Sequence, residues 1–221
     1  MNWRNASKKQ VRFVRCDVTQ PLQIKSAIEA AVRHFGGLDI LVSNAGAVGR
    51  SADVEDWDAD GWGQTQALLL RSVVAGASYA TPHMRKRGGG SIINTSSISG
   101  LQAGYAPMSY SVAKAAVLHF TRVAATELSA HRIRINAVVP GFIATSIFGS
   151  ALGMSLSDAK KLGQAVAERS ASANPIGRSG MPGDIANAAL VFGQRRIKFC
   201  HGHAYHGGWR SDHRPAPQLG H

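Results

Sequence analysis

Short apolar segments alternate with longer amphipathic ones along this chain, and that alternation limits the folds open to it. Residues 21–35 carry apolar side chains at helical spacing, begin with a proline and stop at two glycines, so they predict a helix. Val11–Cys16 before it and Leu38–Val42 after it have the length and composition of strands, the first at a sheet edge. A helix between two strands is typical of a βαβ unit, whose strands are parallel.

The same alternation continues to about residue 192. Further helices are predicted at Trp62–Lys86, Met108–Ser129, Thr145–Arg169 and Pro182–Phe192, and further strands at Ser91–Asn94 and Arg132–Val139. The chain is therefore predicted to be an α/β protein with a doubly wound parallel sheet. Ligands of such sheets bind beyond the carboxyl ends of the strands. Polar or turn-forming residues follow the predicted strands there, at Asp17, Asn44, Ser97 and Pro140-Gly141.

Composition fits one domain. The chain has 221 residues, of which 44% are hydrophobic, so we expect a single domain over residues 1–192 and an aberrant, poorly ordered basic tail over 193–221. We expect a soluble cytoplasmic protein with no membrane partner, because no run of about 18 apolar residues and no leader peptide is present. The net charge of +12 gathers toward both ends and aromatics are few, which argues against nucleic-acid binding.

Tyr110 and Lys114 are the strongest chemical signal. They lie four positions apart on a predicted helix, so they share a face, and a lysine charge there is expected to lower the pKa of the tyrosine. Ser97 lies thirteen residues before Tyr110, where a strand ends, and is placed to share a substrate oxygen with it. Taken alone, such a pair is more often a packed tyrosine beside a solvated lysine.

The wider pattern resembles the short-chain dehydrogenases/reductases from about Val11 to Phe192. The residues that carry the resemblance are Asp17-Val18, Asn44-Ala45-Gly46, Ser97, Tyr110, Lys114, Asn136 and Pro140-Gly141-Phe142-Ile143-Ala144-Thr145. The resemblance implies a Rossmann-type fold and an NAD(P)-dependent oxidoreductase that interconverts an alcohol and a carbonyl by hydride transfer.

The resemblance also implies roles for these residues. Tyr110 would be the general acid and base, Ser97 would orient the substrate oxygen, and Lys114 would lower the Tyr110 pKa and bind the nicotinamide ribose. The cofactor, NAD or NADP, would contact Asp17, Val18, Asn44, Ala45, Gly46, Tyr110, Lys114, Pro140, Gly141, Ile143 and Thr145. Asp17 and Thr145 have simpler alternatives as a helix cap and a turn residue, and Asn136 is interpreted as structural.

Two departures from the family pattern bear on activity. No glycine-rich turn of the type T-G-x-x-x-G-x-G follows a strand, so the first β-α-β unit of the fold and its pyrophosphate site are expected to be missing. Leu69 also stands where the family has an asparagine that holds a proton-relay water. These departures leave an alternative open, namely an inactive fragment that binds the dinucleotide weakly.

The tail departs from the family after Phe192. Permitted codons for residues 191–209, read one base later, yield the family's usual carboxyl-terminal segment, so we hypothesise a frameshift near Val191. The last strand of the sheet is then expected to be lost, leaving an apolar edge exposed. The spacing of His201, His203 and His206 suits a metal, but a segment out of frame would not retain ligands, so no metal is predicted.

The substrate is predicted to be a small, apolar or ring-shaped alcohol or carbonyl compound. This expectation depends on apolar side chains in the segment that covers the substrate in the family, namely Ile147, Phe148, Leu152, Met154 and Leu156. The resemblance further implies a homo-oligomer, a dimer or tetramer, formed through the helices at Trp62–Lys86 and Met108–Ser129.

Overall fold

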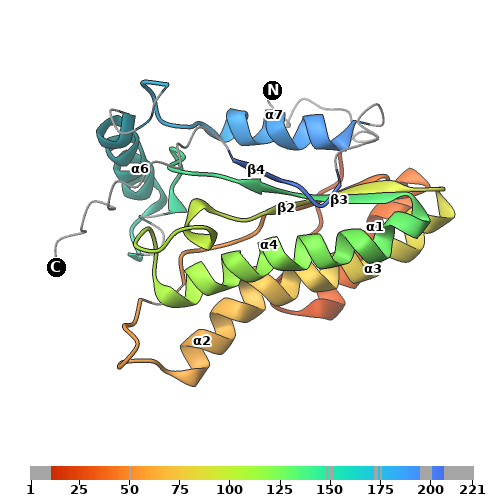
Figure 1. Cartoon of the computed structure of the whole chain (residues 1–221), viewed down its shortest axis with the longest axis horizontal. Coiled ribbons are helices and arrows are strands. Elements are labelled where there is room, and N and C mark those ends of the chain that lie inside the picture. Colours follow the sequence, from red (N-terminus) through yellow and green to blue (C-terminus); the bar gives the residue numbers. More distant parts are fainter. Residues whose placement is uncertain are drawn as a thin grey trace.

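The computed structural model has a sheet of four parallel strands at its centre (Figure 1). The structure describes residues 11–49, 51–147, 149, 152–171, 174, 176–194 and 201–206. The strands are β1 (Ile40–Ser43), β2 (Gly90–Thr95), β3 (Ile133–Val139) and β4 (Ala204–His206), in the spatial order β1-β2-β3-β4. Every neighbouring pair is parallel, which confirms the predicted sheet.

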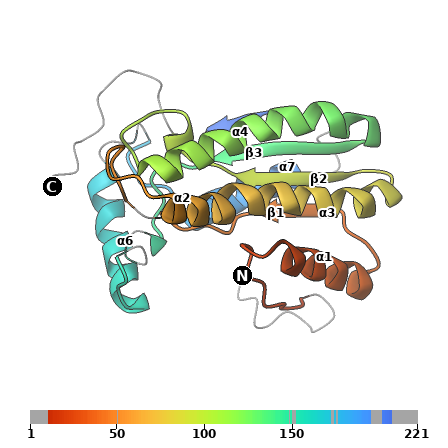
Figure 2. The ribbon, with the colours of Figure 1, turned by 90° about the horizontal axis from the view of Figure 1, so that it is seen from below.

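Helices connect these strands and cover both faces of the sheet. They are α1 (Pro21–Phe35), α2 (Ala59–Gln66), α3 (Ser72–Lys86), α4 (Met108–Leu128), α6 (Leu156–Ala171) and α7 (Pro182–Gly193). A π-helical turn, η2 (Ala67–Arg71), joins α2 to α3, and short 3₁₀ turns occur at η3 (Ile98–Gly100) and η4 (Ser129–His131). Figures 1 and 2 show α1, α3 and α4 on one face, α7 on the other, and α6 beyond the carboxyl end of the sheet.

The core lies mainly between the sheet and the layer of α1, α3 and α4. Ile92, Ile133 and Ile135 of the strands and Met84 of α3 are at most 1% exposed there. On the opposite face a smaller cluster joins Ile93 and Val138 to Phe192 of α7. Because helices cover both faces of the sheet, β2 and β3 are almost continuously buried, as in other parallel sheets.

The register brings the predicted site residues to one edge of the sheet. Ser43 pairs with Asn94, and Asn94 pairs with Ala137, so β1, β2 and β3 end side by side. Asn44 and Pro140 follow β1 and β3 directly, and Ser97 lies two residues beyond β2. The prediction that polar segments gather beyond the carboxyl ends of the strands is confirmed for these three.

Three sequence predictions of secondary structure are wrong. Val11–Cys16 is not a strand, because strand pairing needs a neighbouring backbone and β1 is the last strand on that side among the described residues. The helix expected over Thr145–Arg169 is not continuous: Ile147 and Gly149 are helical, residues 152–153 form a turn, and α6 begins at Leu156, where Ser155 Oγ accepts a cap-like hydrogen bond from the Asp158 N–H. The last strand is not lost, since Ala204–His206 pairs with β3.

The helix predicted at Trp62–Lys86 begins three residues earlier, at Ala59, and is interrupted by the π-helical turn η2. Asp58 caps its start by accepting a hydrogen bond from the Gly61 N–H at 2.6 Å. None of the helices in the described part of the chain is long and apolar enough to cross a membrane.

Candidate active site

Ser97 and Tyr110 meet at the carboxyl end of β2. Ser97 lies two residues beyond the strand, and Tyr110 is the third residue of α4, which packs against the η3 turn that Ser97 begins. The two side chains are joined by a hydrogen bond, and both are partly buried. Two residues thirteen positions apart therefore present their hydroxyl groups to the same space, as the sequence predicted.

Lys114 lies one turn further along α4 and is almost wholly buried, at 4% exposure. Its Nζ donates to the carbonyl oxygen of Thr95 at 2.8 Å and lies 5.5 Å from the centre of the Tyr110 ring. Burial lowers the pKa of Lys114 to about 8, because a charged ammonium loses its hydration there. The lysine is thus still largely protonated at neutral pH, and its stem and charge are held against the end of β2.

The expected effect of Lys114 on Tyr110 is not found in this structure. The pKa of Tyr110 is raised, because burial disfavours the phenolate, and the hydrogen bond with Ser97 opposes this only in part. The sequence places the lysine on the same helical face but gives neither the burial of the phenol nor the bond from Nζ to Thr95. The protonated phenol is therefore the resting form of Tyr110 at neutral pH.

The turn that carries Ser97 is held by a hydrogen bond to Pro140 and by close packing against α4. The Ile98 N–H donates to the Pro140 carbonyl at 2.9 Å, and the Gly100 N–H donates to the Ser97 carbonyl at 3.0 Å. A Cβ added at Gly100 would lie 2.7 Å from the Lys114 carbonyl carbon, so only glycine allows this approach. Ser96 adds a buried hydrogen bond from its Oγ to the Lys114 carbonyl at 2.7 Å.

The segment after β1 forms a second wall beside Lys114. The Thr95 hydroxyl donates to Asn44 Oδ1 at 3.0 Å, which ties this segment to the end of β2. Asn44, Ala45 and Gly46 are exposed. A Cβ at Gly46 would come within 3.1 Å of Leu69 Cδ2 and 4.0 Å of Lys114 Nζ, so the glycine keeps space open above the lysine.

Leu69 is completely buried within the π-helical turn. It presents a hydrocarbon side chain to Gly46 at the position where the resemblance expects a relay asparagine. A π-helical turn inside a helix often marks a functional site, and this one places an apolar wall there.

Asp17 and Val18 lie just before α1. Asp17 accepts hydrogen bonds from the Thr19 N–H at 2.9 Å and the Thr19 hydroxyl at 2.8 Å, which lower its pKa. Asp17 thus forms a local turn before the helix and does not cap it, because the N-cap residue of α1 is Gln20, which makes no side-chain cap hydrogen bond. Val18 packs its side chain against the main core.

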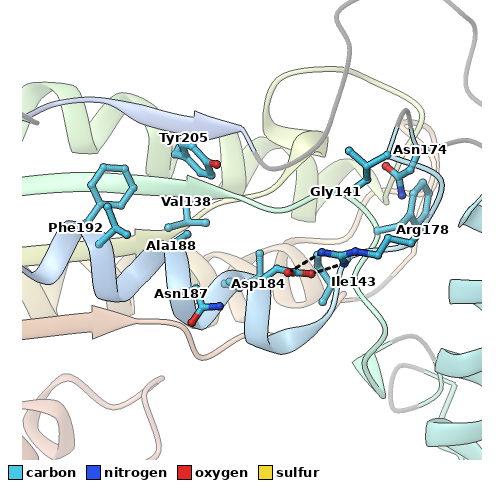
Figure 3. A pocket seen from close by; sticks show the side chains of 15 residues that line it. Val138, Gly141, Ile143, Asn174, Arg178, Asp184, Asn187, Ala188, Phe192 and Tyr205 are labelled. Atoms are coloured by element: carbon cyan, nitrogen blue, oxygen red, sulfur yellow. Dashed lines mark hydrogen bonds and ion pairs between the residues drawn. The ribbon is translucent and has the colours of Figure 1, made fainter.

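The turn after β3 separates two regions of the molecule. Pro140 contacts the Ser97 turn through its carbonyl, whereas Gly141 and Ile143 line a cavity of about 400 Å³ on the α7 side of the sheet (Figure 3). Neither Ser97 nor Tyr110 lines that cavity. Thr145 continues the turn and accepts a hydrogen bond from the Ile147 N–H at 3.4 Å, consistent with a turn threonine.

Figure 3 also shows the ion pair between Arg178 and Asp184 at the rim of this cavity, with two bonds of 2.7 and 2.9 Å. It lowers the pKa of Asp184 to about 2. Asp184 also accepts from the Met181 N–H at 2.8 Å, so it fixes the preceding loop to the start of α7. Gly180 in that loop bridges to Ile143, which holds the turn after β3 in place.

His201 and His203 hold the segment before β4 against β3 and α4. His201 Nδ1 accepts from the Ile135 N–H at 3.2 Å, so its proton lies on Nε2, which donates to the Ala125 carbonyl at 2.5 Å. Both ring nitrogens are therefore in use. His203 contributes its backbone N–H to Asn136 Oδ1 at 3.2 Å, which supports the structural interpretation of Asn136.

Two residues of the site were not identified from the sequence. Thr95 holds Lys114 through its carbonyl and Asn44 through its hydroxyl. Ser99 donates to Ser97 from both its N–H and its hydroxyl. Their position within five residues of a predicted strand end was a weak signal, since backbone carbonyls and turn contacts leave no side-chain pattern.

Comparison with known proteins identifies the family. Residues 3–208 match the family model described as Enoyl-(Acyl carrier protein) reductase. Cis-4-hydroxycyclohexanecarboxylate dehydrogenase of Sinomonas cyclohexanicum is 33% identical over 187 residues, which cover 85% of this chain and 71% of the relative. The 3-oxoacyl-[acyl-carrier-protein] reductase FabG of Thermotoga maritima is 34% identical over 178 residues, 79% of this chain and 66% of that protein.

Solved structures give the same result. A short-chain dehydrogenase/reductase from Burkholderia xenovorans superposes with a TM-score of 0.76 at 30% identity, covering 88% of this chain and 73% of its own. ElxO with NADP bound superposes with a TM-score of 0.75 at 27% identity, covering 90% of this chain and 77% of its own. From its parallel sheet, its matched length and these relatives, the chain belongs to the short-chain dehydrogenase/reductase family of oxidoreductases.

Proposed function

We propose that this chain interconverts an alcohol and a carbonyl compound by hydride transfer with NAD or NADP, and that Tyr110 is the general acid and base. The observation that carries the proposal is the meeting of three side chains from two elements. Tyr110 is hydrogen-bonded to Ser97, and the buried Lys114 Nζ lies 5.5 Å from the Tyr110 ring. The relatives named above are dehydrogenases and reductases, which supports the same chemistry.

The residues around Lys114 fit the nicotinamide end of a dinucleotide. Gly46 leaves open space above the lysine, and the ammonium has two N–H groups beyond the one that donates to Thr95. The exposed backbone of Asn44–Gly46 and the turn at Pro140–Thr145 would flank the cofactor. When bound, the cofactor supplies or accepts the hydride. The similar ElxO structure holds NADP, and rate measurements with each cofactor would distinguish NAD from NADP for this chain.

The protein's own task is to handle a proton at the substrate oxygen. In carbonyl reduction, Ser97 and Tyr110 donate hydrogen bonds to that oxygen, and Tyr110 gives up its proton as the carbonyl carbon receives the hydride. In alcohol oxidation the proton returns to a Tyr110 phenolate. Because the pKa of Tyr110 is raised, reduction should proceed at neutral pH and oxidation should rise with pH.

We further propose that the substrate is an alicyclic alcohol or ketone. The segment before and at the start of α6 exposes the apolar side chains of Leu152 (70%), Met154 (43%) and Leu156 (65%). A relative is named for a hydroxycyclohexane acid, and another, 34% identical, is named 2,5-dichloro-2,5-cyclohexadiene-1,4-diol dehydrogenase.

A homo-oligomer through α3 and α4 is part of this proposal, because Val74, Val112 and Val123 are exposed on them.

The test is a rate measurement on the purified chain. Cyclohexanol derivatives are supplied with millimolar NAD or NADP, and the reduced cofactor is followed by absorbance from pH 6 to pH 10. We expect oxidation that increases with pH and is lost in Tyr110→Phe, while Tyr205→Phe, a substitution at an exposed tyrosine, keeps the wild-type rate. Equal rates in both variants would refute the role of Tyr110.

A further inference from the structure

Ser99 makes an unusual pair of contacts with Ser97. The Ser99 hydroxyl donates to Ser97 Oγ at 3.0 Å, and the Ser99 backbone N–H points to the same oxygen at 3.3 Å. Ser99 is 5% exposed, so water cannot readily replace either contact. The donors come from one residue within the short η3 turn, which is itself anchored on α4 and on Pro140.

A hydroxyl oxygen has two lone pairs and one proton. Since both lone pairs of Ser97 Oγ are occupied by Ser99, the oxygen has no acceptor site left for a further strong hydrogen bond. Its single proton must then point away from Ser99, toward the side on which Tyr110 lies. Ser97 is thereby fixed as a donor rather than an acceptor.

We propose that Ser99 is a positioning residue that sets the hydrogen-bond polarity of Ser97, so that Ser97 donates to the Tyr110 oxygen in the free protein and to the substrate oxygen during the reaction. This inference deepens the proposed function and rests on it for its catalytic meaning. Its effect on Tyr110 does not depend on substrate or cofactor.

The direction of the hydrogen bond between Ser97 and Tyr110 matters because Tyr110 must give up a proton in reduction and take one up in oxidation. A donor at its oxygen stabilises the phenolate, whereas an acceptor would stabilise the phenol. Without the Ser99 hydroxyl, one lone pair of Ser97 is free to accept the Tyr110 proton, and the two arrangements compete. The charged group that the described residues place against Tyr110 is Lys114, which is unchanged by this substitution.

The experiment is an NMR titration of the full chain labelled with ¹³C at the tyrosine ζ carbon. The chain has four tyrosines, and Tyr110→Phe assigns the signal of interest. Ser99→Ala should move the Tyr110 titration upward by about 0.5 of a pH unit, the size of a weakened neutral hydrogen bond. Ser97→Ala should raise it at least as much, and Ser97→Ala/Ser99→Ala should equal Ser97→Ala alone.

A matched control is Ser170→Ala, which removes one hydroxyl from another serine pair, Ser170 and Ser179 at 2.6 Å, and should leave the Tyr110 titration unchanged. An unshifted titration in Ser99→Ala, or an equal further shift in the Ser97→Ala background, would overturn the inference. In the rate assay, Ser99→Ala should lower kcat by about 3- to 10-fold with KM unchanged. A wild-type chain without hydride transfer refutes the proposed function alone, because the titration cycle is measured without substrate.

Discussion

Replacing Lys114 by methionine should stabilise the protein at neutral pH while removing a residue of the proposed catalytic site. Lys114 is 4% exposed, and its pKa falls from 10.5 to about 8 because its charge is desolvated. At about 1.4 kcal/mol per pH unit, that difference corresponds to a cost of about 3 kcal/mol for keeping the folded lysine charged at pH 7. The charge-assisted hydrogen bond to the Thr95 carbonyl returns about 2 kcal/mol, which Lys114→Met gives up.

The net expectation is a free energy of unfolding higher by about 1 kcal/mol for Lys114→Met at pH 7. The sign of the pH dependence follows from the lowered pKa. Between about 8 and 10.5 the unfolded lysine binds more protons than the folded one, so the lysine's cost diminishes as pH rises. The stability difference should therefore move by about 2 kcal/mol in favour of wild type between pH 7 and pH 9.5, so that the methionine variant becomes the less stable one at pH 9.5.

Urea unfolding at both pH values measures this difference, and comparing two variants at each pH cancels the titration of every other group. Lys160→Met, a substitution at an exposed lysine of α6, is the matched control and should show little change at either pH. If Lys114→Met were less stable than wild type at pH 7, or if its advantage did not vary with pH, the inference of a buried charge beside Tyr110 would fail.

Two further predictions concern the framework of the site. Gly100→Ala brings a Cβ within 2.7 Å of the Lys114 backbone, so it should lower the free energy of unfolding by about 1–3 kcal/mol, as urea unfolding would show, and displace the η3 turn; stability equal to wild type would contradict the close packing. Asp184→Asn removes the partner of Arg178, so the variant should melt below wild type at pH 6. Since the pKa of Asp184 is lowered to about 2, its contribution is complete above about pH 4 and is lost as pH falls through 2, so the two melting temperatures should converge near pH 2; a constant gap would argue against this ion pair.

Local sequence patterns predicted the elements whose stability depends on their own residues and one apolar face. Helix α1 begins at Pro21 and ends before Gly36, as predicted, because proline suits a first helical position and glycine adopts the left-handed conformation (φ 78°) that ends a helix. Local sequence patterns failed where pairing with a neighbouring strand decides whether a segment is a strand. Val11–Cys16 alternates like a strand but has no neighbouring strand among the described residues, whereas Ala204–His206 has no strand pattern and still pairs with β3.

In the candidate site, too, some features could be predicted from local sequence patterns, and others depend on tertiary packing. Ser97 and Tyr110 were predicted to lie together because strand ends and helical faces follow from periodicity, and the structure brings them together. The direction of the Tyr110 pKa could not be predicted, since it depends on how deeply α4 buries the phenol. The contacts of Thr95 and Ser99 were missed because one is a backbone carbonyl and the other is a turn contact.

The proposed reaction, hydride transfer from the cofactor with Tyr110 as the proton donor, is tested most directly by isotope transfer in wild type and Tyr110→Phe. A cyclic ketone is incubated with the chain and with NADH or NADPH carrying deuterium at the transferable position of the nicotinamide, and the alcohol is analysed by mass spectrometry. We predict an alcohol with one deuterium on carbon, formed at least about 100-fold more slowly by Tyr110→Phe. Unlabelled alcohol would contradict hydride transfer from the cofactor, and equal rates for wild type and Tyr110→Phe would contradict the role of Tyr110.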